Sequence, residues 1–165
     1  MSTDNLALMR MARESLKEKW ALAIGTFLVY IVITGSGGFL HAGGSLLSLL
    51  IGGPFALGAA TFSLTLSRGG EAKIEQIFQG FNRFTTALGA YLLMIIYIIL
   101  WMLLLIIPGI IAALSYSMTF YIMADEPNIK PEEALNKSKQ MMDGYKLKFF
   151  YLGLRFFLLA LLCIL

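Results

Sequence analysis

The sequence predicts an all-α fold, a polytopic transmembrane helical bundle of about five spans with amphipathic interfacial helices on its cytoplasmic face. First, 58% of the 165 residues are hydrophobic and 14% are charged, whereas about 25% of residues in soluble domains are charged. Second, the charges fall in blocks between long apolar runs. Third, these runs lack the alternation of barrel strands, and helices satisfy their own backbone in lipid.

The rare residue types exclude several classes of protein. A single cysteine, Cys163, leaves no internal disulfide, and a single histidine, His41, leaves no Cys/His cluster for zinc or haem. The net charge of +3 is what basic cytoplasmic loops produce, so we expect no nucleic-acid partner. We also expect no catalytic residue, no metal and no cofactor.

Each span needs about 20 apolar residues to cross the hydrocarbon core. We place the spans at about 20–40, 46–66, 84–106, 109–124 and 147–165. The run from 84 to 124 is twice the required length, and the helix-breaking pair Pro108 and Gly109 divides it into a hairpin. Pro54 is predicted to kink or break the second span. Such a break either lines a binding site, as in transporters, or only punctuates the chain.

The cationic residues predict the orientation of the chain. Twelve of the 13 lysines and arginines lie before residue 20, between 67 and 83, or between 125 and 148, while the turns near 35–45 and 106–110 have none. Cytoplasmic loops carry such an excess of cations. We therefore predict a single multi-pass membrane domain over 1–165 with a cytoplasmic N-terminus.

Three charged segments are predicted as amphipathic interfacial helices, at about 4–19, 71–83 and 130–146. The clearest is 71–83, whose apolar residues recur at the spacing of one helix face: Ile74, Ile77, Phe78 and Phe81. Helices that combine such a face with cations lie on anionic membrane surfaces. The alternative is that these helices only cap and orient the hairpins.

An internal repeat is predicted from steps that place a cation beside an aromatic residue. Lys19-Trp20, Arg83-Phe84 and Lys148-Phe149 follow one another at 64 and 65 residues. We infer repeat units at 4–67, 68–129 and 130–165, the third incomplete, so that a sixth span is expected beyond the last residue. Two alternatives are that the protein ends after five spans, and that such steps only mark membrane interfaces.

Several stretches resemble one known family. The segment 101–127 reads WMLLLIIPGIIAALSYSMTFYIMADEP, with a tryptophan, an Ile-Pro-Gly-Ile-Ile step, a Ser-Tyr-rich span and an Asp-x-Pro exit. Further matching residues are Glu133-Ala134-Leu135, Ser138, Met142 and Gly144 after it, and Arg13, Leu16-Lys17, Trp20, Gly53-Pro54 and Gly80-Phe81 before it. Together they resemble the bacterial integral membrane proteins of the family known as DUF975, a domain of unknown function.

This resemblance implies a bacterial plasma-membrane protein, of a kind most familiar from Gram-positive organisms. Family members generally continue into another span, which agrees with the incomplete third unit. The resemblance brings no established activity, so no residue role follows from it.

The candidate contact residues for lipid or a partner are cations of the cytoplasmic segments: Lys137, Lys139, Lys146, Lys148 and Arg83. Arg155 is the only cation away from the ends of the predicted spans, and a charge at mid-membrane costs about 2.5–3.5 kcal/mol. It either contacts an anion within the bundle or reaches back to the headgroups. Asp125 and Glu126, which precede a proline, form either an acid or cation site or an ordinary turn.

The leading prediction is a non-enzymatic membrane protein whose cytoplasmic helices engage anionic lipid or a partner, either another membrane protein or a second copy of the chain. The alternative is a transporter or permease-like subunit with a site at the kinked spans near Arg155. A polar cavity around Arg155, Tyr97, Tyr116 and Ser117 would favour that alternative. An enzyme has the least support, because no nucleophile–base pair stands out.

Overall fold

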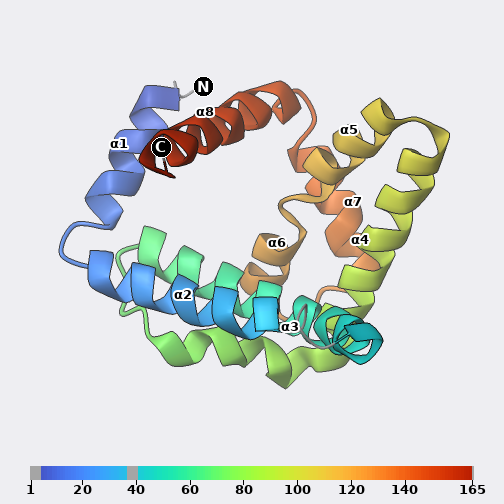
Figure 1. Cartoon of the computed structure of the whole chain (residues 1–165), viewed down its shortest axis with the longest axis horizontal. Coiled ribbons are helices and arrows are strands. Elements are labelled where there is room, and N and C mark those ends of the chain that lie inside the picture. The colour runs from blue at the N-terminus through green and yellow to red at the C-terminus, as the bar shows by residue number, and fades with distance from the viewer. Residues whose placement is uncertain (1–4, 37–40, 165) are drawn as a thin grey trace.

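The computed structural model describes residues 5–36 and 41–164, and every element within these ranges is helical (Figure 1). In chain order they are α1 (Asn5–Ser15), α2 (Trp20–Ser36), α3 (His41–Ser67), the 3-10 helix η2 (Ile74–Arg83), α4 (Phe84–Leu104), α5 (Ile106–Tyr116), α6 (Thr119–Asp125), α7 (Pro131–Met141) and α8 (Lys146–Ile164). The all-α prediction is confirmed for this part of the chain. The His41 side chain and part of the predicted turn at 35–45 lie outside the described residues.

Helix α3 continues through Pro54, so the predicted break is not found there, while the predicted kink stays a prediction. The helix runs from His41 to Ser67 with Pro54 in its interior. A proline removes one backbone hydrogen bond, but helices in membrane-type bundles tolerate this where neighbouring segments surround the site. Here Pro54 is fully buried, and the backbone of Gly80 lies directly against its carbonyl group.

The segment 71–83, predicted as an interfacial helix, contains η2, which packs along α3. Glycines permit this, because a Cβ on Gly58 would overlap the Ile77 carbonyl and a Cβ on Gly80 would overlap the Pro54 carbonyl. Of the apolar stripe, Ile77 is fully buried. Phe81 meets the ring of Phe55 at a centroid distance of 5.0 Å. The apolar stripe of this segment is therefore partly used within the protein.

The long apolar run after residue 84 is interrupted twice. Helix α4 ends at Leu104, and Leu105 is extended at φ −166° and ψ 146°. A proline ring clashes with the carbonyl four residues earlier, so Pro108 prevents α4 from continuing past Leu104. The predicted single helix at 109–124 is also divided, because α5 ends at Tyr116 and α6 begins at Thr119.

The main core lies where α3, α4, α6 and α7 meet. Its buried side chains are Leu57 and Ala60 from α3, Ala87 and Ala90 from α4, Phe120, Ile122 and Met123 from α6, Ile129 from the following loop, and Ala134 and Leu135 from α7. Helix α7 lies within the predicted segment 130–146, but its apolar face is covered by the protein. The sequence pattern showed that this helix has an apolar face without showing what covers it.

A helix–turn–helix motif occurs twice with the same backbone hydrogen bonds. Between α1 and α2, the amides of residues 16, 17, 19 and 23 bond to the carbonyls of 12, 14, 16 and 19. Between α7 and α8, amides 142, 143, 145 and 149 bond to carbonyls 138, 140, 142 and 145. Each residue number in the second motif exceeds its equivalent in the first by 126. At this offset Glu18 corresponds to Gly144, and both residues have a positive φ.

The offset of 126 differs from the 129 that separates Lys19-Trp20 from Lys148-Phe149. Long cationic and aromatic side chains reach an interface from more than one turn, whereas a backbone turn has a fixed register. The predicted middle unit, 68–129, carries η2 where this motif would be expected.

Three described segments are long and apolar enough to cross a membrane: Ser48–Ser67, Ile74–Leu104 and Ile106–Asp125. The middle segment contains η2 and α4, which meet at an angle (Figure 1). Residues 103–107, at the tip of the α4–α5 hairpin, are between 65% and 85% exposed. A soluble protein seldom exposes so continuous an apolar surface.

Candidate functional site

Two of the five predicted contact cations form contacts with other residues of the same chain. Lys137 of α7 forms an ion pair with Glu126, and Arg83 donates from Nη1 to the Pro127 carbonyl at 2.9 Å. Both contacts hold the loop between α6 and α7. These two side chains therefore have a structural role, which could not be predicted from their position in a basic segment.

Lys139 and Lys146 are brought together. Lys139 lies in the last turn of α7 and Lys146 is the first residue of α8. Both line a recess of about 340 Å³, hereafter the basic recess, whose other lining residues are Trp101, Pro108, Ile111, Ala112, Ser115 and Tyr116. The recess therefore combines two ammonium groups with two amphipathic aromatic side chains.

The turn between α7 and α8 places these two lysines. Helix α7 ends at Met141, and the following turn has Gly144 at φ +75°. Glycine adopts this left-handed conformation without a steric penalty, and four residues separate the end of α7 from the start of α8. Lys139 and Lys146, seven residues apart, consequently border the same recess.

Ser138 anchors α7 against the junction of α5 and α6. Its buried hydroxyl donates to the Ser115 carbonyl at 2.8 Å and accepts from the Met118 amide at 3.1 Å. Both backbone groups lie at the break between the two helices, where the regular helical bonds are lost. Lys139 follows this anchor directly in the chain and lines the basic recess, as Tyr116 does.

The remaining polar groups of the basic recess are few. The Ser115 hydroxyl already donates to the Ile111 carbonyl at 2.8 Å. Tyr116 stacks on Tyr97 with ring centroids 5.9 Å apart. A bound molecule would therefore meet two ammonium groups, an indole and a phenol on an otherwise apolar wall, a set suited to an anion that carries an apolar part.

Lys148 and Arg155 lie elsewhere. Lys148 borders a cavity between α8 and α1 whose lining includes Asn5, Leu8 and Phe149. Arg155 is exposed on α8 and does not line the basic recess. The Ser117 hydroxyl donates to the Leu114 carbonyl at 2.8 Å. Of the four side chains that the transporter prediction joins, the structure thus brings Tyr97 and Tyr116 together.

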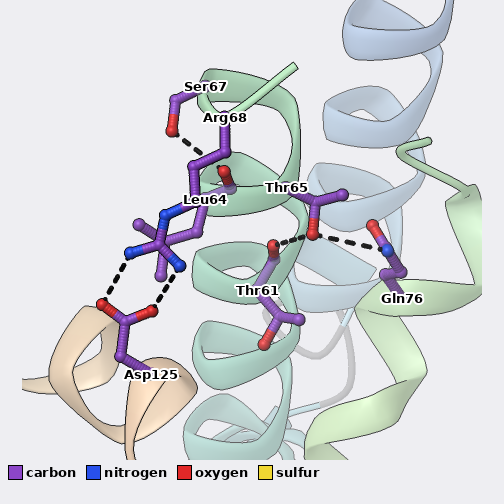
Figure 2. Close-up of polar contacts among 7 residues, drawn as sticks. All are labelled: Thr61, Leu64, Thr65, Ser67, Arg68, Gln76 and Asp125. Atoms are coloured by element: carbon purple, nitrogen blue, oxygen red, sulfur yellow. Dashed lines mark hydrogen bonds and ion pairs between the residues drawn. The ribbon is translucent and has the colours of Figure 1, made fainter. Parts of the chain in front are cut away.

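Asp125 forms an ion pair that was not predicted from the sequence. Arg68, at the end of α3, donates from Nη1 to Oδ1 at 2.7 Å and from Nη2 to Oδ2 at 2.9 Å (Figure 2). The hydrogen bonds and charge of Asp125 raise the pKa of Arg68 above its ordinary value. The two side chains are 63% and 42% exposed, so they form a surface ion pair that links α3 and α6.

The residues around this ion pair form hydrogen bonds mainly within α3. Thr65 donates to the Thr61 carbonyl at 2.9 Å and accepts from Gln76 of η2 at 3.5 Å (Figure 2). The partners Arg68 and Asp125 are 57 residues apart, and no local pattern links them. Within the described ranges, no group of three or more His, Cys, Asp or Glu side chains comes together as a metal site would require.

Comparison with known proteins identifies a family. A family model described as "Protein of unknown function (DUF975)" matches residues 1–115 and 102–165. No curated protein and no solved structure matches the chain.

Proposed function

We propose that this chain, which belongs to the DUF975 family of proteins of unknown function, is a multi-pass membrane protein that holds an anionic phospholipid at the basic recess. Three helical segments of sufficient length and apolarity support membrane insertion. The exposed apolar tip of the α4–α5 hairpin also supports it, since lipid covers such a surface without cost. The proposed location is the bacterial plasma membrane.

The charged loops favour a cytoplasmic N-terminus. The contacts Arg68–Asp125 and Arg83–Pro127 join the segment between α3 and α4 to the end of α6 and the residues that follow it, so two cation-bearing segments meet. A cysteine introduced at Lys130 in a Cys163→Ser background tests this orientation. We expect an impermeant maleimide to label it only in inside-out vesicles. Labelling in intact cells would contradict the orientation.

The observation that carries the proposal is the convergence of Lys139 and Lys146 on a recess that also contains Trp101 and Tyr116. A lysine near an anionic headgroup contributes about 1 kcal/mol. Two lysines therefore predict a preference for anionic over zwitterionic lipid of about thirtyfold. Tryptophan and tyrosine favour the headgroup level of a bilayer. The lining supplies no nucleophile–base pair, so we propose binding and not catalysis.

The test uses Trp101 as a reporter. Trp20 and Trp101 are the two tryptophans of the chain, so Trp20→Phe leaves Trp101 alone beside the recess. The full chain in a mild detergent is titrated with phosphatidylglycerol or phosphatidylcholine that carry identical brominated chains, which quench a nearby indole. We expect saturable quenching with a strong preference for phosphatidylglycerol.

The double variant Lys139→Gln/Lys146→Gln should lose this preference. The matched double variant Lys17→Gln/Lys130→Gln, which removes two exposed lysines outside the recess, should retain it. If the two double variants prefer phosphatidylglycerol over phosphatidylcholine to the same extent, the proposal is overturned. If the recess variant instead loses a co-purifying protein while its lipid preference is unchanged, the recess binds a protein partner and the lipid proposal fails.

A further inference from the structure

We infer that a second site, at the other end of the molecule, takes an acyl chain of an anionic phospholipid. Two adjoining cavities of about 400 and 340 Å³ share Ala12, Leu16 and Trp20 in their linings. We call the combined hollow the Trp20 groove. It lies between α1, α2, the end of α3 and α8, none of which except α8 borders the basic recess.

The larger cavity is suited to a hydrocarbon chain. Besides the shared residues, its lining includes Ala23, Ile24, Phe27 and Leu66. The cavity also contains three serine hydroxyls, but each donates to a carbonyl of its own helix: Ser15 to Met11 at 2.9 Å, Ser63 to Ala59 at 2.8 Å and Ser67 to Leu64 at 3.0 Å. No hydroxyl of this wall is left to donate to a ligand, so an alkyl chain matches it better than a polar molecule.

The smaller cavity adds positive charge. Arg10 and Arg13 of α1 line it together with Met9 and, from α8, Phe156. Both arginines are exposed, and the two ion pairs found among the described residues involve neither. Guanidinium groups bind phosphate by paired hydrogen bonds. An apolar cavity that opens beside two guanidinium groups therefore matches a chain joined to a phosphate headgroup.

The repeated helix–turn–helix motif supports this assignment independently. At the offset of 126 given by the backbone hydrogen bonds, Arg13 corresponds to Lys139 and Trp20 corresponds to Lys146. Arg13 and Trp20 line the groove, and Lys139 and Lys146 line the basic recess. Both copies of the motif thus border a cation-lined hollow at equivalent positions. The two hollows differ in that the Trp20 groove continues into the apolar cavity.

The inference goes beyond the proposed function, because it concerns other helices and a ligand recognised by its chain. Trp101→Phe leaves Trp20 as the sole tryptophan and reports this site alone. The full chain in detergent is titrated with phosphatidylglycerol that carries brominated chains, and with phosphatidylcholine that carries the same chains. We expect saturable quenching of Trp20, with phosphatidylglycerol binding more tightly.

Two pairs of variants separate the chain from the headgroup. Ala12→Phe fills the junction of the two cavities and should abolish saturable quenching, whereas Ala21→Phe, on the exposed surface of α2 outside the groove, should not. Arg10→Gln and Arg13→Gln should each weaken phosphatidylglycerol binding about fivefold. Lys17→Gln, a matched loss of charge at an exposed position, should not.

If Trp20 quenching rises linearly with lipid and is equal in Ala12→Phe and Ala21→Phe, the proposed acyl-chain site is overturned. Equal binding of both lipids, unchanged by the arginine variants, would overturn the assignment of an anionic ligand. Lys139→Gln/Lys146→Gln should leave Trp20 quenching unchanged. Because Trp101 and Trp20 report in separate backgrounds, failure at the groove is distinguished from failure at the basic recess.

Discussion

Replacing Gly58 with alanine places a methyl group where the backbone of η2 lies against α3. The new Cβ would lie 2.8 Å from the Ile77 Cα and would overlap the Ile77 carbonyl. Carbon atoms in favourable contact are about 3.5–4.0 Å apart, so the two backbones must separate by about 1 Å. The neighbouring atoms belong to the backbone of a helix and cannot rotate away.

The cost follows from this separation. Forcing an extra methyl group into a packed interface costs about 1–3 kcal/mol, and the rigid neighbour places Gly58→Ala near 3 kcal/mol. A gap of 0.5–1 Å also forfeits about a quarter to a half of each dispersion contact. At about 2–4 °C per kcal/mol for a chain of this size, we expect a melting temperature lower by about 6–12 °C.

Thermal unfolding in detergent, followed by size-exclusion chromatography of the remaining folded protein, measures this effect. Gly25→Ala in α2 is the matched control, because a Cβ there meets nothing within 4 Å. The control should match or slightly exceed the wild type, since alanine favours a helix by up to about 1 kcal/mol over glycine. If Gly58→Ala melts together with Gly25→Ala, the close approach of η2 to α3 is wrong.

Three further predictions concern single contacts. Ser138→Ala leaves two backbone groups at the α5–α6 break, one buried and one part-buried, without the Ser138 hydroxyl. It should lower the free energy of unfolding by about 2 kcal/mol in denaturant titration. A wild-type midpoint would show that this anchor is dispensable. Glu18→Gly should raise stability by up to about 1 kcal/mol in the same titration, because Glu18 has a φ of +66° and glycine relieves that strain; a loss of stability would mean that the side chain matters more than the backbone. Arg68→Gln and Asp125→Asn should each destabilise less than Ser138→Ala, because their ion pair is exposed; a double-mutant cycle with strong coupling would contradict this.

Local pattern was sufficient to predict two of the long helices and where one of them must end. The apolar runs predicted α3 and α4 to within a few residues of their ends beside the charged loop. Pro108 predicted the interruption after Leu104 through its own steric clash. The same reasoning allowed a break at Pro54 that the helix does not have. Whether a buried proline ends a helix depends on what surrounds it, and here that is a segment more than 20 residues later in the chain.

The candidate site was only half predictable. Lys139 and Lys146 were selected from the sequence as cations of the charged segments, together with Lys137, Lys148 and Arg83. Composition does not distinguish these five residues from one another. Contacts with Glu126 and Pro127 hold Lys137 and Arg83, and these contacts join segments that have no common local pattern.

The sequence by itself determined that this chain is helical, apolar enough for lipid, and basic on particular segments, because composition and periodicity act over one or two helical turns. Only the tertiary structure decided which apolar faces are covered, which cations remain available, and that Trp20 and Trp101 each border a cation-lined hollow. Those outcomes depend on side chains separated by tens of residues, and packing between helices is what brings such residues together.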